Sequence, residues 1–84
     1  MPYFIYILKC ADGTFYTGST NDLKKRLHTH NNLKAGALYT RWRRPVEMIY
    51  HEEYQSKSEA MIREYQIKKL PRKQKEKLVE TVQE

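Results

Sequence analysis

Two tyrosines near the start of the chain are the first side chains whose type and spacing could serve chemistry. Tyr6 and Tyr16 stand ten residues apart, in two β-rich runs separated by Asp12-Gly13, a dipeptide typical of a hairpin. A phenol can transfer a proton or hold a phosphate oxygen by hydrogen bonding. Tyrosine is also a good strand former, so the pair taken alone is more often structural than catalytic.

The length of the hairpin loop decides whether the two phenols share a face, because side chains alternate along a strand. A two-residue Asp12-Gly13 loop would place Tyr6 and Tyr16 on opposite faces. A three-residue Ala11–Gly13 loop, with Gly13 in the left-handed conformation, places them on one face. Its cross-strand pairs are Cys10 with Thr14, Leu8 with Tyr16, and Tyr6 with Gly18. We predict the three-residue loop, with the glycine opposite Tyr6 leaving the neighbourhood of the phenols open.

Two further residues with functional side chains lie one helical turn apart. Arg26 and His30 share one face of the expected helix. An Arg fork binds phosphate oxygens in a bidentate way, and His can donate a proton or position water. His28 points elsewhere and reads as a surface residue. The single cysteine and three histidines lack zinc-ligand spacing.

Glu64 is the charged exception in an apolar series that recurs on one helix face: Ala60, Met61, Glu64, Ile67 and Leu70. A carboxylate that faces the interior is costly unless it is paired or bound to a cation. Mg²⁺ suits one carboxylate completed by waters and substrate phosphate. The alternative, which stays open, is a glutamate at the rim of the helix that pairs with a neighbouring lysine.

The charge of the chain favours a polyanionic partner. The net charge is +6, and Lys24 to Arg44 contains seven Lys or Arg and no acid. We expect six residues of this segment to contact nucleic acid: Lys25, Lys34, Arg41, Trp42, Arg43 and Arg44. Trp42 could stack on a base. The seven bases between Arg63 and Lys77 accompany Glu64 and Glu76 and read more readily as a solvated surface.

The local patterns predict an α+β fold with the order β-β-α-β-α-α, in which helices flank a small, three-stranded, mainly antiparallel sheet. We expect strands at Tyr3–Leu8, Thr14–Gly18 and Val46–Tyr54. We expect helices at Leu23–His30, from Ser56 or Ser58 to Leu70, and at Arg72–Val82, with Leu78, Val79 and Val82 as apolar contacts of the last. Thr20, Asn21 or Asp22 can cap the first helix. Asn31–Pro45 is expected to be a loop, and Pro71 interrupts the helical pattern.

The bulk properties bound the class of protein. A chain of 84 residues is one domain, 1–84. Cys10 is the only cysteine, which rules out an intramolecular disulfide and fits a reducing compartment. We find neither the roughly 18 consecutive apolar residues of a membrane helix nor a signal peptide, and we expect a cytoplasmic protein.

Taken together, these residues resemble the GIY-YIG nuclease superfamily over nearly the whole chain. The matching set is Tyr6, Tyr16-Thr17-Gly18, Arg26, His30 and Glu64. A second set resembles the branch that holds structure-selective endonuclease catalytic subunits and small stand-alone YhbQ-like bacterial proteins: His30-Asn31, Ala35-Gly36, Thr40-Arg41 and Arg43-Arg44-Pro45. The length is most similar to the YhbQ-like group. Phe4 and Thr17 depart from the family pattern, at the first-motif glycine and at the middle of the second motif.

The resemblance implies a metal-dependent DNA endonuclease, a hydrolase of phosphodiester bonds that acts in repair or on branched or damaged DNA. It implies that Arg26 contacts phosphate and that Glu64 binds one ion, Mg²⁺ or Mn²⁺. His30 matches a position whose role in the superfamily is less uniform. The resemblance leaves open which tyrosine is the general base. We favour Tyr6, with Tyr16 orienting water or phosphate.

Two readings compete with a self-sufficient nuclease. One is a nucleic-acid-binding module with little intrinsic activity, or one that needs a protein partner to supply specificity. The other is a protein-interaction domain that uses the hairpin and the basic loop as its surface. Glu64 on an apolar helix face favours the nuclease, because a pure binding module has little reason to place a carboxylate there.

Overall fold

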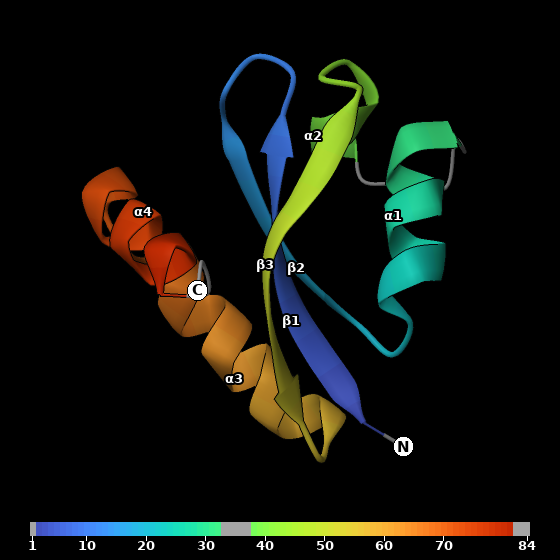
Figure 1. Cartoon of the computed structure of the whole chain (residues 1–84). Helices are drawn as coiled ribbons and strands as arrows, with labels where there is room; N and C mark the ends of the chain where they lie inside the picture. Colours follow the sequence, from blue (N-terminus) through green and yellow to red (C-terminus); the bar gives the residue numbers. More distant parts are fainter. Residues whose placement is uncertain (1, 33–37, 82–84) are drawn as a thin grey trace.

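The centre of the fold is a three-stranded antiparallel sheet, seen in a computed structural model that describes residues 2–32 and 38–81 (Figure 1). The strands are β1 (Tyr3–Cys10), β2 (Phe15–Thr20) and β3 (Val46–Tyr54), in the order β2-β1-β3. The apolar run Ile5–Leu8 lies in the central strand, where both faces are covered, and its residues are at most 1 % exposed. β1 extends two residues beyond the predicted end, because Lys9 and Cys10 also pair across the sheet.

Helices cover both faces of the sheet, with α1 (Leu23–Asn32) on one side and α3 (Lys57–Lys68) and α4 (Arg72–Glu80) on the other (Figure 1). This confirms the α+β class and the predicted order of the main elements. The segment expected to be a loop contains a short helix, α2 (Leu38–Arg41), so that part of the prediction was wrong. Val82 lies outside the described residues. In the part of the chain that the structure describes, no helix has the length and apolar character to span a membrane.

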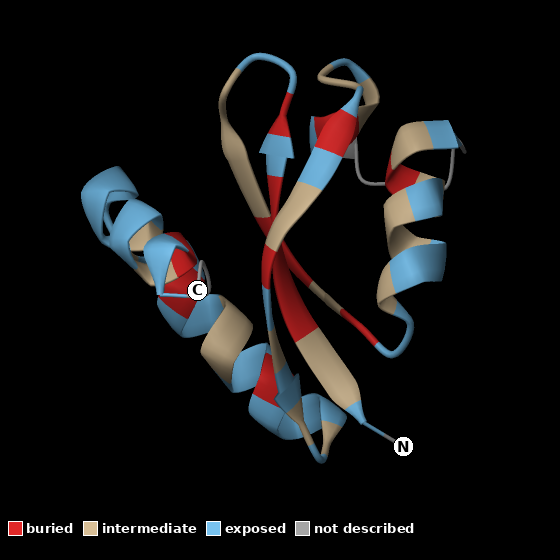
Figure 2. Cartoon of the chain, viewed as in Figure 1, coloured by how far each residue is buried: buried red, intermediate tan, exposed pale blue. Residues whose placement is uncertain are grey.

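Buried residues concentrate in the sheet, above all in β1 (Figure 2). The alternation of side chains along β1 divides the apolar residues between two cores. One lies under α3 and α4 and contains Ile5, Ile7, Tyr50, Ala60, Ile67 and Val79. The other lies under α1 and contains Tyr6, Leu8, Cys10 and Val46, with Tyr16, Leu23, Leu27 and Met48 packed against it. The two tyrosines of the hairpin therefore belong to the α1 side of the sheet.

The hairpin loop has the predicted three residues. Gly13 has a φ of +85°, its N–H donates to the carbonyl of Cys10 at 2.9 Å, and the N–H of Cys10 donates to the carbonyl of Thr14 at 2.8 Å. The resulting register pairs Leu8 with Tyr16 and Tyr6 with Gly18. Both tyrosine side chains therefore rise from one face, as expected.

Side-chain caps and one polar cluster fix the positions of the helices. Asp22 Oδ1 accepts the N–H of Lys25 at the start of α1, at 3.1 Å. Ser56 caps α3 in the same way. Arg63 of α3 binds Glu52 of β3 through two hydrogen bonds of 2.8 and 3.1 Å, which ties the helix to the sheet. The hydroxyls of Tyr50 and Tyr54 also donate to this carboxylate.

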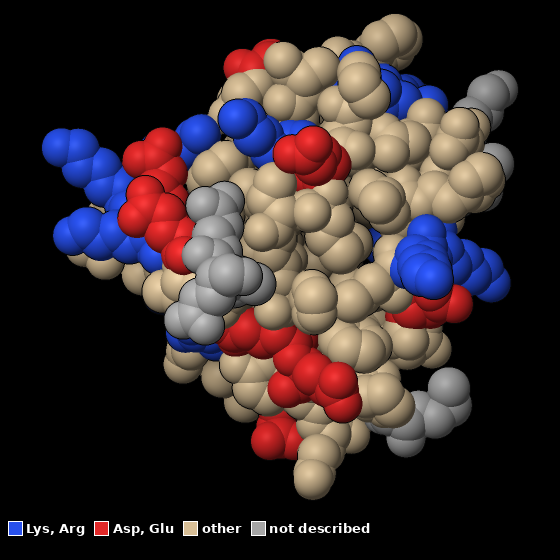
Figure 3. All heavy atoms as spheres, in the orientation of Figure 1, with Lys and Arg blue, Asp and Glu red and all other residues tan. Residues whose placement is uncertain are grey.

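Basic side chains gather along two sides of the molecule, over α4 and over α1, on the face shown in Figure 3. Several of them are neutralised within the fold. Ion pairs with N–O distances between 2.8 and 3.2 Å join Arg43 to Asp12, Arg63 to Glu52, Lys68 to Glu64 and Arg72 to Glu76. Fewer basic side chains are therefore available to bind a partner than the net charge suggests.

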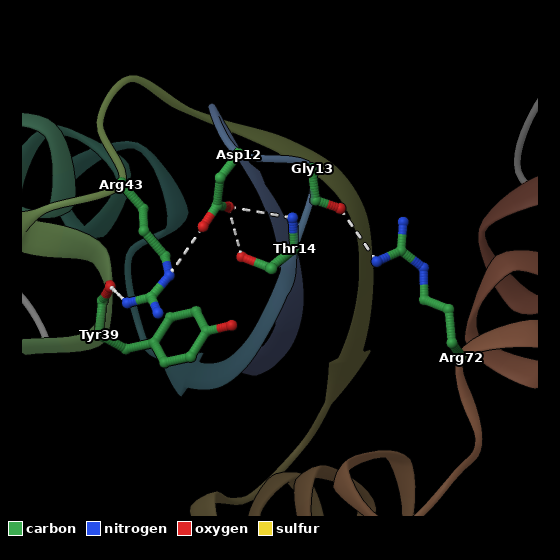
Figure 4. Close-up of polar contacts among 6 residues, drawn as sticks. All are labelled: Asp12, Gly13, Thr14, Tyr39, Arg43 and Arg72. Atoms are coloured by element: carbon green, nitrogen blue, oxygen red, sulfur yellow. Dashed lines mark hydrogen bonds and ion pairs between the residues drawn. The ribbon is translucent and has the colours of Figure 1, made fainter.

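Two arginines hold the hairpin loop from opposite sides (Figure 4). Arg43, just after α2, donates to Asp12 at 3.0 Å and to the carbonyl of Tyr39 at 2.8 Å. Arg72, at the start of α4, donates to the carbonyl of Gly13 at 2.9 Å. Its guanidinium also lies 3.7 Å from the ring centroid of Phe15. The loop that sets the tyrosine register is thereby fixed to elements far away in the sequence.

We predict that Arg72→Ala lowers the free energy of unfolding by about 1–2 kcal/mol, since it removes a hydrogen bond and a cation–π contact. Urea unfolding followed by circular dichroism measures the loss. The matched control is Lys73→Ala, an exposed neighbour on the same helix, which should change stability by less than about 0.5 kcal/mol. Equal effects of the two substitutions would show that the Arg72 contacts contribute nothing.

Candidate active site

The phenol of Tyr6 lies over Gly18, its partner on the edge strand β2. A Cβ atom added at Gly18 would stand 2.6 Å from Cζ of Tyr6, closer than any side chain tolerates. The space that we expected the glycine to leave open is thus filled by the Tyr6 ring itself. Because β2 is an edge strand, the ring carries its hydroxyl toward the border of the sheet.

Two residues of α1 hold the Tyr6 hydroxyl. His30 Nε2 lies 2.9 Å from the phenol oxygen, and Arg26 Nε donates to the same oxygen at 3.3 Å. Arg26 and His30 reach one atom together because they are one helical turn apart. The other nitrogen of His30, Nδ1, lies 2.8 Å from the hydroxyl of Thr40. Tyr6 is 1 % exposed and His30 and Thr40 are fully buried.

Burial sets the protonation of this cluster. It raises the pKa of Tyr6 to about 12, against the opposing influence of Arg26. It lowers the pKa of His30 to about 4, with the positive charges of Arg26 and Arg44 acting in the same direction. The hydrogen bond to Tyr6 raises the pKa of Arg26. At neutral pH the free protein therefore holds a neutral phenol, a neutral imidazole and a charged guanidinium.

Tyr16 and Glu64 complete the group from two other elements. The Tyr16 ring packs edge-on against His30, with 5.2 Å between centroids, and against Tyr39 of α2 at 5.7 Å. Tyr16 and Glu64 both contribute to raising the pKa of Tyr6, which places them within electrostatic range of its phenol. Of the five predicted catalytic residues, Arg26 and His30 contact the Tyr6 hydroxyl, Tyr16 packs on His30, and Glu64 acts on Tyr6 through its charge alone.

Glu64 stands at the margin of the buried face of α3. Its side chain is 19 % exposed, and Oε2 lies 2.8 Å from Nζ of Lys68, one turn along the helix. The pairing with a neighbouring lysine that the sequence left open is confirmed. Met61 does not share the buried face, because it is 51 % exposed, and the buried members of the stripe are Ala60 and Ile67.

A cation already occupies a position at Glu64, since the Lys68 ammonium contacts the carboxylate directly. A hard ion that needs one carboxylate, with waters and phosphate as its other ligands, fits this donor set. Among the described residues no group of three or more His, Cys, Asp or Glu could hold a metal. The residues present therefore suit an ion that shares its coordination with substrate, not a closed structural site.

Some of the residues predicted to contact nucleic acid have accessible side chains, and others already form hydrogen bonds within the chain. Lys25 is exposed and lines a depression of about 210 Å³ that Arg26 also borders. Trp42 is 82 % exposed. Arg41 is half-buried, and Lys34 lies outside the described residues.

Arg43 and Arg44 already serve the fold. Arg43 binds Asp12 and Tyr39, and Arg44 Nε donates to the carbonyl of His30 at 2.6 Å. The acid-free stretch predicted to form a DNA-binding surface therefore also contains side chains that stabilise the positions of α1, α2 and the hairpin.

Two structural partners of the site escaped the sequence reasoning. Thr40 contacts His30, and Asn31 makes two hydrogen bonds to the backbone of Val46, at 2.7 and 3.0 Å, that fix the end of α1 to β3. Both belong to the His30-Asn31 and Thr40-Arg41 pairs on which the family resemblance rested. That resemblance was the one signal that could have marked them, since a lone Thr or Asn in a loop carries none.

Comparison with known proteins identifies the family of this domain. The family model described as the GIY-YIG catalytic domain matches residues 2–77. A protein of Bacillus pumilus named UPF0213 protein is 56% identical over 78 residues, which cover 93% of this chain and 79% of that protein. UPF0213 protein YazA of Bacillus subtilis is 54% identical over 78 residues, with 93% and 78% covered.

Two solution structures have the same fold. The UPF0213 protein BH0048 of Bacillus halodurans is 43% identical, with a TM-score of 0.63, over 98% of this chain and 86% of that one. The protein EF2693 of E. faecalis is 46% identical, with a TM-score of 0.65, over 96% and 85%.

We predict that His30 makes the protein less stable in mild acid. Its folded pKa of about 4 lies below the ordinary histidine value of 6.5, so the unfolded chain binds this proton first. The stabilisation is complete above about pH 6.5 and is lost as the pH falls toward 4. Between pH 7 and pH 5 the loss should be about 2 kcal/mol.

Urea unfolding of wild type, His30→Gln and His28→Gln at both pH values measures this contribution. His30→Gln should remove most of the pH dependence, whereas His28→Gln, at an exposed position of α1, should keep it. An unchanged pH dependence in His30→Gln would contradict the assignment.

Proposed function

Because the chain belongs to the family of GIY-YIG catalytic domains, alongside small bacterial proteins named UPF0213, we propose that it is a metal-dependent endonuclease that hydrolyses DNA phosphodiester bonds. The observation that carries this proposal is the pair of contacts that Arg26 and His30 make with the Tyr6 hydroxyl, with the Tyr16 ring packed on His30. This cluster offers a proton acceptor and a phosphate clamp, and Glu64, whose charge acts on Tyr6, offers a cation ligand.

Tyr6 is the better candidate for the general base. Its hydroxyl is the one bonded to both Arg26 and His30, whereas Tyr16 meets His30 through its ring. The Tyr6 oxygen can take a proton from water while its own proton passes to His30. Tyr6 can therefore serve as a general base without becoming charged. Tyr16 is partly exposed and would orient the water or a phosphate oxygen.

Arg26 would couple substrate binding to the exposure of this base. In the free protein its Nε–H occupies a lone pair of the Tyr6 oxygen at 3.3 Å, a long hydrogen bond. A DNA phosphate offers the guanidinium a charged, bidentate partner, which is a stronger acceptor than a neutral phenol. When Arg26 turns to the phosphate, the released lone pair becomes available to the attacking water, and the guanidinium stabilises the charge that develops on phosphorus oxygens.

A preformed phenolate and a protonated His30 are both costly in the free protein, so the proton shuttle needs the negative charge of a bound phosphate to favour the imidazolium. With a pKa of about 12, ionising Tyr6 at pH 8 costs about 5 kcal/mol in the free protein. In a shuttle, the water O–H bond breaks as the Tyr6 oxygen takes that proton, and the original Tyr6 proton moves to Nε2 of His30. The water oxygen bonds to phosphorus and the ester oxygen departs. The departing oxygen takes a proton from solvent, and His30 afterwards returns its proton to solvent through Tyr6.

Glu64 would hold the one ion of the site, Mg²⁺ or Mn²⁺. Such an ion, when bound, supplies positive charge to the scissile phosphate and the leaving oxygen. Glu64 pairs with the Lys68 ammonium in the free protein, so the ion would have to displace this lysine.

The accessible basic and aromatic side chains would hold the nucleic acid. Lys25 lies beside Arg26 at the depression on α1, and the exposed ring of Trp42 can stack on a base. Contacts of this kind recognise phosphate and exposed bases and not a base sequence. We therefore infer a branched or damaged DNA substrate, a role in repair, and a protein partner that adds specificity.

A nucleic-acid-binding module is the second candidate, and one observation favours it. Tyr6 is 1 % exposed and Glu64 is paired with Lys68, so the site is closed in the free protein. A module of this kind would bind DNA in a salt-sensitive manner, retain binding in Glu64→Gln and cut nothing.

Cleavage of labelled branched and linear DNA in Mg²⁺ tests the proposal. We expect Glu64→Gln and Tyr6→Phe each to lower kcat by about 100-fold or more, because each removes a group that acts on the reacting atoms. Tyr16→Phe should have a smaller effect. Glu53→Gln and Tyr65→Phe, at exposed positions, serve as matched controls and should cut like wild type. Cutting by Glu64→Gln at the wild-type rate would refute the metal-dependent mechanism.

The position of Lys68 yields a test that does not depend on cutting. Removing a cation that competes for Glu64 should strengthen metal binding, so Lys68→Gln should raise the affinity for Mn²⁺ by about two- to fivefold. Calorimetric titration with Mn²⁺ measures this. Lys69→Gln removes the same charge from a residue that packs on the ring of Tyr65, and it should leave the affinity unchanged. Weaker Mn²⁺ binding in Lys68→Gln would contradict competition at Glu64.

A further inference from the structure

The hydrogen bonds around Tyr6 determine which nitrogen of His30 carries the proton. Arg26 Nε can only donate, so the Tyr6 oxygen accepts from it. The Tyr6 hydroxyl is buried, and its own proton needs an acceptor. His30 Nε2, at 2.9 Å, is the acceptor in reach. Nε2 is therefore unprotonated, and the neutral imidazole carries its proton on Nδ1.

The proton on Nδ1 must in turn be received by Thr40. The Thr40 hydroxyl lies 2.8 Å from Nδ1 and both residues are fully buried. A hydroxyl oxygen can accept this N–H and still donate its own proton elsewhere. The opposite tautomer would bond Nε2–H to the Tyr6 oxygen, and the buried Tyr6 proton would then have lost its acceptor.

We propose that Thr40 is a positioning residue that holds His30 in the tautomer able to receive the Tyr6 proton. This inference rests on the proposed function, since it names the residue that prepares the acceptor for the same reaction. Thr40 touches no reacting atom. It acts through His30, and it accepts the same Nδ1–H before and after Nε2 takes up a proton. The imidazole thus needs no rotation during the transfer.

The short helix α2 explains how Thr40 reaches this position. The ring of Tyr39 packs against Tyr16, and Arg43, just after the helix, binds the carbonyl of Tyr39 and the Asp12 carboxylate. The backbone carbonyl of Thr40 accepts the N–H of Arg43 at 3.0 Å. These contacts fix the helix against the α1 side of the sheet, with the Thr40 side chain directed at His30.

The experiment reads the tautomer directly by long-range ¹H–¹⁵N correlation of the histidine rings in ¹⁵N-labelled protein. Wild type and Thr40→Ser should both show His30 protonated on Nδ1, because serine keeps the accepting oxygen. Thr40→Val keeps the shape of threonine and removes the acceptor, so its His30 should shift toward the form protonated on Nε2. The signals of His28 and His51, at exposed positions, should not change and serve as internal controls.

Cleavage by the same proteins gives the functional readout. Thr40→Val should lower kcat by roughly tenfold or more with KM changed less than about twofold, and Thr40→Ser should restore most of the rate. A wild-type His30 protonated on Nε2 would overturn the inference. So would a Thr40→Val protein with an unchanged tautomer and rate. If Thr40→Val does not fold, the wild-type and Thr40→Ser spectra decide the question. Absence of cutting by wild type would reject the proposed function and leave the tautomer result to stand.

Discussion

The missing side chain at Gly18 is the constraint on which the site depends. Any Cβ at this position would overlap the phenol of Tyr6, so the ring could not lie across β2. Only in that orientation does the hydroxyl leave the middle of the sheet and approach the edge. Arg26 and His30 of α1 contact the hydroxyl there. The glycine thus permits a side chain of the central strand to meet two residues of α1 at one atom.

This arrangement also places a series of hydrogen-bonded polar side chains in the interior of a small domain. Tyr6, His30 and Thr40 are all nearly or fully buried, and an unpaired member would cost about 1–3 kcal/mol. Each has a partner, and the partners come from three elements: β1, α1 and α2. Asn31 and Arg44 add bonds that hold the end of α1 next to β3 and the loop before it. The segment between α1 and β3 is therefore a structural support for the site as well as a surface.

The sequence predicted the sheet, its helices and the hairpin register because these follow from local rules. Asp12-Gly13 indicates the turn, and the apolar run Ile5–Leu8 indicates a central strand. The sequence could not show that α2 forms, because four residues have no periodicity and depend on tertiary contacts such as Arg43 with Tyr39.

For the site, spacing placed Arg26 beside His30, but their common target was not visible in any local pattern. The structural roles of Arg43 and Arg44 could not be predicted either, although these residues stand in a clear sequence pattern. A run of basic residues has the same sequence pattern whether its side chains contact a partner or other parts of the same chain. Here both arginines bind groups within the chain.

The closed state of the site bears on how a nuclease of this design would choose its substrate. Tyr6 is 1 % exposed, and Arg26 occupies one side of its hydroxyl in the free protein. Under the proposed function, a phosphate has to come close enough to draw the guanidinium away. If this approach bends the DNA backbone, a regular duplex resists it more than a junction, flap or lesion does. Selectivity for branched DNA would then arise from access to Arg26 and Tyr6, and a protein partner would add to it.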